Sequence, residues 1–280
     1  MILKKGKEKM LLNKDGLTEA EFLAQYNPGD YKRPSVTTDI LVLGMSKGFK
    51  NLKILLIKRG DHPFINCWAL PGGFIEENET AFHSAKRELK EETGLDQTYL
   101  DQIYTFTKPG RDPRMWVMSI AYLALVSNLE DVNGRDDADD AAWFDLFFTK
   151  DKIVLKNEEK DVTIKYNLTT KQFKNSILTY TNYIPTLVSK ERLAFDHIEI
   201  IIEAMKKLRE SIDYSDNLFC LMPPKFTMAE LRATYQAVMN RDVYKTTLKR
   251  IVENKIEKTG SMRKSSVLNG RQSEEFSYTG

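Results

Sequence analysis

The sequence has few cysteines, no long apolar run and little net charge, and each absence excludes a class of protein. Its two cysteines, Cys67 and Cys220, lie too far apart for a metal-ligand spacing or a disulfide framework. No apolar run approaches the roughly 18 residues that a membrane-spanning helix needs. The basic N-terminal segment contains no apolar core of signal-peptide length. We therefore expect a cytoplasmic protein that does not contact membranes.

The near balance of charge excludes a uniformly basic protein. Over 280 residues the net charge is only +2, so contact with nucleic acid would require a local basic patch. A content of 41% hydrophobic and 29% charged residues fits a soluble globular protein. The length predicts more than one domain.

Apolar patterning predicts an alternation of strands and helices. A helix is predicted at 17–26, where Thr18 and Glu21 form a capping box. A second is predicted from Glu79 to Thr93, begun by Asn78 and ended by Gly94. A loop is predicted at 61–73, and an amphipathic helix at 197–212. Strands are predicted at 37–45, 52–59, 104–108, 115–126 and 141–148, with a polar hairpin at 152–168.

The second helix crowds carboxylates on one side. At about 100° per residue, Glu88, Glu91 and Glu92 share one sector, whereas Lys86 and Lys90 point elsewhere. Like charges this close repel each other, and a solvated face would normally interleave the two signs. Composition alone favours a solvated face, but the arrangement favours a site for Mg²⁺ or Mn²⁺, which prefer oxygen ligands.

A longer pattern decides between these alternatives. From Gly73, through Glu79, to the run RELKEETGL at 87–95, the sequence resembles the Nudix box at every fixed position. The resemblance implies an α/β fold, the Nudix α/β/α sandwich with a mixed sheet, and metal-dependent hydrolysis of a nucleoside diphosphate derivative. It assigns the catalytic and metal-binding roles to Gly73, Glu79, Arg87, Glu88, Glu91 and Glu92.

The resemblance also implies a role for each of these residues. The three glutamates at 88, 91 and 92 bind Mg²⁺ or Mn²⁺, and the Gly73 carbonyl adds a ligand. Arg87 orients the ligand carboxylates, and with Glu79 it supports the loop–helix–loop. The general base stays open between a box glutamate and an acid in the segment GRDDADDAAW at 134–143.

The substrate must be chosen by residues outside the box. The loop KPGRDPR at 108–114 offers cations suited to phosphate groups or ribose hydroxyls. Together with YKRPSVTTDI at 31–40 and LAFDHIEII at 193–201, it resembles the Nudix branch of ADP-ribose pyrophosphatases and Nudix-related regulators of NAD metabolism. This implies an ADP-ribose-like nucleotide as the ligand. The predicted substrate contacts are Arg59, Phe106, Arg111 and Arg114.

The C-terminal part concentrates positive charge. Residues 241–272 contain nine lysines and arginines and three acids, an excess of +6. Before them, a capping box at Thr227 and Glu230 predicts the start of a helix, and a second helix and a strand-and-loop tail follow. The first helix is predicted to bury Leu231, Tyr235 and Val238, and the second to bury Tyr244, Leu248, Ile251 and Val252.

This part resembles the winged helix-turn-helix of the Nudix-related regulators. It departs from their pattern at Gln272, where proline is usual, and at Thr247, where asparagine is common. The resemblance implies double-stranded DNA as a partner and a homodimer, since most helix-turn-helix sites are symmetric. The predicted DNA contacts are Lys245, Thr247, Lys249, Arg250 and Arg271.

We expect three parts in the chain. They are an N-terminal extension at 1–34, a Nudix domain at 35–212 with a hairpin insertion at about 150–190, and a winged helix-turn-helix domain at 213–280. Two functions remain open. The intact box favours a hydrolase that converts ADP-ribose to AMP and ribose 5-phosphate. The basic helix pair favours an ADP-ribose-responsive repressor, and one protein can do both.

Overall fold

A computed structural model describes residues 11–96, 98–131, 141–175 and 178–280. It divides the chain into two compact units, Met1–Pro34 and Ser35–Gly280. In the first unit, α1 (Glu19–Gln25) is followed by a short 3₁₀ helix, Pro28–Asp30. The predicted capping box is confirmed, because the Thr18 hydroxyl accepts from the Glu21 backbone and Glu21 accepts from the Thr18 backbone. No described residue of this unit is buried.

The second unit is built on one mixed sheet. Among the described residues it joins ten strands, in the order β10-β9-β8-β7-β2-β1-β6-β5, with β3 beside β2 and β4 beside β1. Among the strand pairings within the described ranges, only that of β1 with β6 is parallel in this sheet. The strands are β1 (Ser35–Met45), β2 (Leu52–Lys58), β3 (Trp68–Ala69), β4 (Gly72–Phe74), β5 (Tyr99–Phe106), β6 (Val117–Val126), β7 (Ala141–Phe148), β8 (Lys152–Asn157), β9 (Val162–Asn175) and β10 (Leu178–Leu187).

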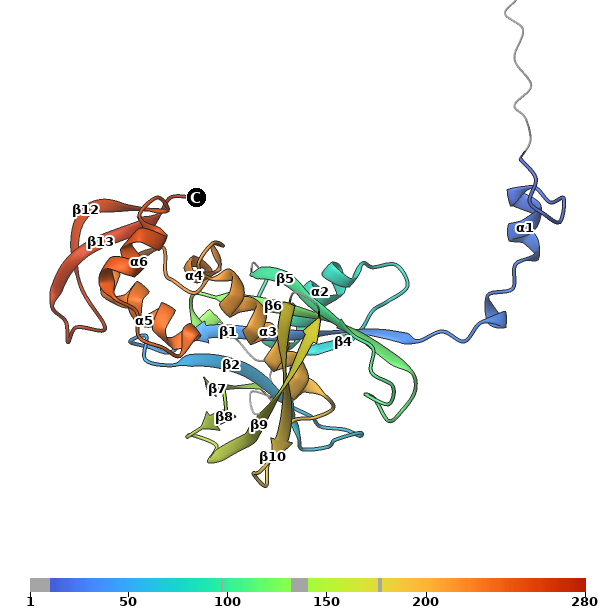
Figure 1. Cartoon of the computed structure of the whole chain (residues 1–280), viewed down its shortest axis with the longest axis horizontal. Coiled ribbons are helices and arrows are strands. Elements are labelled where there is room, and N and C mark those ends of the chain that lie inside the picture. Colours follow the sequence, from blue (N-terminus) through green and yellow to red (C-terminus); the bar gives the residue numbers. More distant parts are fainter. Residues whose placement is uncertain (1–10, 97, 132–140, 176–177) are drawn as a thin grey trace, which may run out of the picture. The chain divides into compact units, whose positions relative to one another are not determined.

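Helices cover both faces of this sheet (Figure 1). From Thr38 to Met45, successive residues of β1 point to opposite faces and are all buried, which explains the apolar run that begins at Ile40. On one face, Ile40 packs in a cluster with Leu89 of α2 (Ala81–Thr93). On the other, Leu41 packs in the cluster that contains Met205 of α3 (His197–Ser211). The predicted α/β/α sandwich is confirmed. No helix in the described ranges is long and apolar enough to cross a membrane.

Two local predictions before the acidic helix are wrong. The segment predicted as loop at 61–73 contains β3 and the start of β4, strands too short to give a periodic signal. Helix α2 is capped by Thr80, whose hydroxyl accepts from the His83 backbone at 3.2 Å, and Asn78 does not cap it. Gly94 ends the helix with φ of 77°, as predicted.

The predicted hairpin is confirmed, and the sheet extends beyond it. β8 pairs with β7 and β9 pairs with β8, and β10 adds a third strand that the polar sequence did not indicate. Ile153, Leu155 and Ile164 of this segment are buried in the main core. The segment therefore continues the sheet.

The C-terminal part is a helix-turn-helix with a two-stranded wing. The elements after α3 are α4 (Asn217–Cys220), β11 (Lys225–Thr227), α5 (Met228–Met239), α6 (Lys245–Val252), β12 (Ile256–Lys264) and β13 (Gln272–Tyr278). Strand β13 pairs with both β11 and β12. The capping box of Thr227 and Glu230 begins α5 as predicted. The prediction that α6 buries Tyr244 is wrong, because Tyr244 occupies the N-cap and is 83% exposed.

Candidate functional site

Two glycines bring the loop before α2 close to the backbone of β1 and to a carboxylate of α2. In the β1–β4 pairing, Asp39 lies opposite Gly72 and Thr38 opposite Gly73. A Cβ on Gly72, whose φ is 152°, would lie 2.0 Å from the Thr38 carbonyl oxygen. A Cβ on Gly73 would lie 2.2 Å from Oε1 of Glu88. Only glycine allows both approaches without a shift of the neighbours.

Arg87 fastens this loop to the helix. Its guanidinium donates to both carboxylate oxygens of Glu79 at 2.7 and 3.2 Å, and to the Phe74 carbonyl at 3.2 Å. It also donates to Glu88 at 2.7 Å. The hydrogen bond from Arg87 and one from the Glu76 backbone lower the pKa of Glu79 to about 2. Arg87 thus fixes the position of Glu88 beside Gly73.

The three remaining box carboxylates differ in their surroundings. Glu92 accepts a hydrogen bond from the Gly72 backbone at 2.8 Å. Glu88 is half-buried, whereas Glu91 is exposed and reaches Arg87 at 3.5 Å. Burial, together with the charges of Glu88, Asp39 and Glu91, raises the pKa of Glu92 to about 8, although the hydrogen bond from Gly72 lowers it. Negative charge is therefore in excess around Glu92.

This donor set fits a hard divalent cation in its chemistry. Within the described ranges, no three acidic, histidine or cysteine side chains converge as a ready-made metal cluster. Glu88 and Glu92 nevertheless both lie against the Gly72–Gly73 backbone, and the excess negative charge there favours a cation. Carboxylate and carbonyl oxygens suit Mg²⁺ or Mn²⁺.

The raised pKa of Glu92 predicts a pH-dependent stability in protein treated with a chelator. Between about pH 4.5 and 8 the folded protein keeps a proton on Glu92 that the unfolded chain has lost. The free energy of unfolding should therefore fall as pH rises through this window. Urea unfolding at several pH values, compared between wild type and Glu92→Gln, isolates this contribution. Equal pH slopes in the two proteins would show that Glu92 does not titrate there.

Behind the box lies a buried ionic network. Asp39 contacts the Arg111 guanidinium at 3.2 Å and Nε2 of His197 at 3.4 Å, and accepts from the Ser119 hydroxyl. Burial disfavours the charged form of Asp39, but His197, Arg111 and Ser119 outweigh it and hold its pKa at about 2. Nδ1 of His197 accepts from the Leu70 backbone at 2.9 Å. The sequence patterns did not predict this network, although a buried aspartate directly before the apolar run of β1 was a signal.

Arg111 belongs to this network. It donates to both carboxylate oxygens of Asp196 at 2.7 and 3.0 Å, and its side chain is only 5% exposed. Its donors are directed at Asp39 and Asp196 inside the protein, which connects the loop after β5 to the start of α3. Phe106, also predicted as a substrate contact, is buried in the main core.

The two other predicted contacts meet around an aromatic ring. The Arg59 guanidinium carbon lies 5.0 Å from the centre of the Phe195 ring, and that of Arg114 lies 5.8 Å from it. Arg114 also lies 5.4 Å from the ring of Phe74, which follows Gly73. Phe195, which has a φ of 49°, was not predicted as a site residue from the sequence. Such rings and guanidinium groups offer flat surfaces for a planar ligand and charge for a phosphate.

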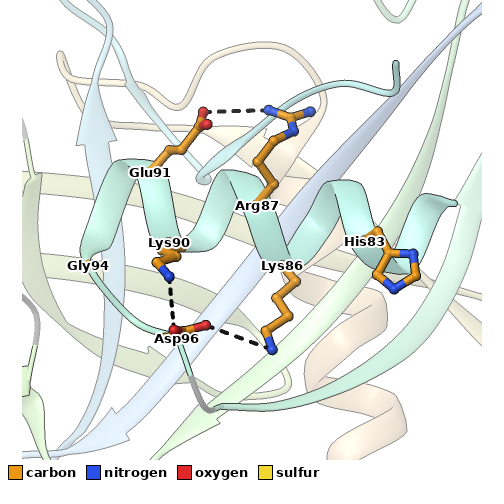
Figure 2. Close-up of a pocket in the computed structure, with 7 residues that line it drawn as sticks. All are labelled: His83, Lys86, Arg87, Lys90, Glu91, Gly94 and Asp96. Atoms are coloured by element: carbon orange, nitrogen blue, oxygen red, sulfur yellow. Dashed lines mark hydrogen bonds and ion pairs between the residues drawn. The ribbon is translucent and has the colours of Figure 1, made fainter. Parts of the chain in front are cut away.

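The outer face of α2 forms a shallow hollow (Figure 2). Lys90 and Lys86 pair there with Asp96 at 2.9 and 3.8 Å. Both lysines are exposed, as the helical spacing predicted, and we assign this face no ligand. Its lining is His83, Lys86, Arg87, Lys90, Glu91, Gly94 and Asp96. The other proposed source of a general base, the segment at 134–143, falls largely on residues 132–140, outside the described residues.

A second candidate surface lies between α6 and the wing. A groove there is lined by Lys245 and Lys249 of α6 and by Arg271, which precedes β13. Of the other predicted DNA contacts, Arg250 is exposed on α6 outside this lining and Thr247 is half-buried. The groove is not purely basic, because Glu274 also lines it and pairs with Lys258 at 2.6 Å.

Comparison with known proteins identifies the family. Residues 34–165 match the NUDIX domain, and residues 218–277 match the NrtR DNA-binding winged helix domain. The crystal structure of a MutT/nudix family protein from Enterococcus faecalis is 31% identical, with a TM-score of 0.74 over 94% of both chains. The chain belongs to the Nudix family. The predicted resemblance is confirmed, and so is the predicted fold class, a Nudix α/β fold followed by a C-terminal winged helix.

Relatives of this Nudix protein include a repressor and an enzyme. The ADPR responsive transcriptional repressor NtrR of Acinetobacter baylyi is 29% identical over 83% of this chain and 78% of its own. The ADP-ribose pyrophosphatase of Methanocaldococcus jannaschii is 42% identical over 41% of this chain and 64% of its own. Shewanella oneidensis NrtR complexed with a 27mer DNA, 24% identical, has the same fold with a TM-score of 0.64 over 87% of this chain and 93% of its own.

Proposed function

We propose that this protein is a metal-dependent pyrophosphohydrolase of nucleoside diphosphate derivatives, with ADP-ribose as the favoured substrate. One observation carries the proposal: Glu88 and Glu92 lie against the Gly72–Gly73 backbone and Arg87 fastens the loop to the helix. The similarity to an ADP-ribose pyrophosphatase over 116 residues supports the choice of substrate.

Each residue of the box has a distinct role in the proposed hydrolysis. Glu88, Glu91, Glu92 and the Gly73 carbonyl would hold Mg²⁺ or Mn²⁺, which would supply positive charge against the diphosphate and make an attacking water more acidic. Arg87 keeps Glu88 in place, and the Gly72 backbone keeps Glu92 in place. Water attacks one phosphorus, the bridging P–O bond breaks with its electron pair on the leaving phosphate, and the proton of the water passes to a general base, either a box glutamate or an acid of the segment 134–143. The products are AMP and ribose 5-phosphate.

Substrate recognition is assigned to the surface around Phe195. We propose that Arg59 and Arg114 contact phosphate or ribose groups and that Phe195 or Phe74 stacks on a planar part of the ligand. Arg111 acts indirectly, because it holds the loop that carries Arg114 against α3 through Asp196. We no longer propose a substrate contact for Phe106, since it is buried.

The proposal predicts a specific pattern of products. Incubated with Mg²⁺ and a panel of nucleoside diphosphate derivatives, the protein should release AMP from ADP-ribose fastest, and a chelator should stop the release because the carboxylates alone cannot neutralise the diphosphate. Chromatography of the reaction mixtures measures this. If no member of the panel is cleaved with either Mg²⁺ or Mn²⁺, the hydrolase assignment is wrong.

A second function is favoured by the groove between α6 and the wing. Lys245, Lys249 and Arg271 from two separate elements line it. We propose that the winged helix, within a domain at 213–280, binds double-stranded DNA as a homodimer and that an ADP-ribose-like ligand in the Nudix domain at 35–212 weakens this binding. The similarity to an ADPR responsive repressor over most of both chains supports this role.

A further inference from the structure

The first turn of α3 is held by residues that border the proposed nucleotide site. Its N-cap, Asp196, receives two hydrogen bonds from Arg111, and its first residue, His197, bonds the Leu70 backbone two residues before Gly72. Lys108 of the same loop as Arg111 pairs with Glu199 at 2.7 Å. A displacement of the loop that carries Arg114 would therefore be passed to the start of α3.

The last turn of α3 is held by the DNA-binding domain. Arg209 donates through Nε to the Val238 carbonyl of α5 at 2.7 Å and through Nη2 to the Phe148 carbonyl of β7 at 2.8 Å. Its guanidinium carbon also lies 4.8 Å from the centre of the Phe148 ring. In the described part of the chain, no carboxylate forms an ion pair with Arg209. Partial burial of this cation costs free energy, which the two carbonyls and the ring offset. Because one carbonyl belongs to α5 and the other to β7, the side chain holds the two domains together.

The Val238 carbonyl lies next to the turn between α5 and α6, which sets the direction of α6. Asn240 ends α5 in the left-handed conformation, and α6 begins five residues later at Lys245. The fully buried Val238 and Leu248 join α5 and α6 to one core, so the two helices move together. A shift of the Arg209 side chain would change the position of the C-terminal end of α5 and, with it, the direction of α6.

We propose that α3 is the connection that transmits nucleotide binding to the DNA-binding domain, and that Arg209 is the positioning residue that couples the two. A helix of 15 residues is a rod about 22 Å long, which can pass a displacement from one end to the other. This inference rests on the proposed nucleotide-responsive DNA binding. It adds the route and names the residue that carries it.

The test separates coupling from simple anchoring. Arg209→Met keeps the apolar part of the side chain and removes the donors to Val238 and Phe148, whereas Arg209→Lys keeps a charge with fewer directed donors. Lys206→Met is the matched control, because Lys206 lies on the same helix and, in the part of the chain that the structure describes, pairs only with Glu203 at 3.0 Å. DNA affinity is measured with and without α,β-methylene ADP-ribose, at fixed salt and Mg²⁺. The DNA is a duplex that the wild-type protein has selected from a random library.

We expect the analogue to weaken DNA binding by the wild type by a factor in the range of about 5–150. The same factor should hold for Lys206→Met, fall towards one for Arg209→Met, and be intermediate for Arg209→Lys. The affinities of the Met variant for each ligand alone should stay near those of wild type. An Arg209→Met protein could bind DNA more weakly while the analogue still lowers its DNA affinity by the wild-type factor. That result would show that Arg209 is purely structural and would overturn the inference.

Two further outcomes are also decisive. A wild type that binds both ligands with no effect of one on the other would refute the nucleotide response itself, which belongs to the proposed function. If Arg209→Met does not fold, Arg209→Lys decides. A smaller effect of the analogue on DNA affinity, with normal affinities for DNA alone and for the analogue alone, supports the inference. An unchanged effect of the analogue overturns it.

Discussion

Replacing Glu92 by glutamine is expected to lower the turnover of ADP-ribose by about 100-fold or more, a barrier increase of about 2.7 kcal/mol, while the protein stays folded. The amide oxygen of glutamine can still accept the hydrogen bond that Gly72 donates to Glu92, so the loop keeps its position. The substitution removes the negative charge that a divalent cation needs. It also removes the repulsion from Glu88, Asp39 and Glu91, so the folded state should not be weakened.

Steady-state release of AMP in saturating Mg²⁺ measures this effect. Glu77→Gln is the control, because Glu77 is an exposed glutamate of the same loop and has no assigned role. It should leave turnover unchanged, and thermal unfolding should show that both variants are folded. A Glu92→Gln protein as active as wild type would remove Glu92 from the site.

Removing the two groove lysines of α6 should weaken DNA binding and flatten its salt dependence. Each phosphate that a lysine neutralises releases about 0.9 counterion, so Lys245→Ala with Lys249→Ala should lower the slope of log affinity against log salt by about 2. Both residues line the groove that Arg271 borders from the wing. Arg250 is exposed on the same helix outside this lining, so Arg250→Ala should have a smaller effect.

Fluorescence anisotropy at several salt concentrations measures both the affinity and the slope. A matched control removes Lys150 and Lys152, two exposed lysines of the Nudix domain, and thereby lowers the net charge equally. If this control flattens the slope as much as the α6 variant does, the groove is not the contact surface. The winged helix would then attract DNA only through the charge of the whole protein.

The box could be predicted because its chemistry is local. Glu88, Glu91 and Glu92 share a helix, and their spacing alone places them on one side of it. Gly73 comes against Glu88 through a short loop, which a fixed spacing also captures. The long helices and the strands β1, β2, β6 and β7 were likewise predicted from periodic patterns, whereas the short strands β3 and β4 and the polar strand β10 were not.

Residues whose partners are distant in sequence could not be predicted in the same way. Arg111 resembled a ligand contact because its partner Asp196 lies 85 residues away. Asp39 and His197 were missed because the network that joins them exists only after β1, β6 and α3 pack together. Phe195 showed no signal as a site residue, since an aromatic in an apolar segment is most often part of a core.

The most direct test of the account asks whether ADP-ribose bound by this protein is cleaved. A stoichiometric mixture of wild-type protein, ADP-ribose and Mg²⁺ is incubated, the protein is denatured, and the nucleotides are separated and quantified. The account predicts equal amounts of AMP and ribose 5-phosphate, with their formation lost in Glu92→Gln. Recovery of intact ADP-ribose from a complex shown by calorimetry to have formed would contradict it, and would leave a Nudix domain that binds the nucleotide without hydrolysing it.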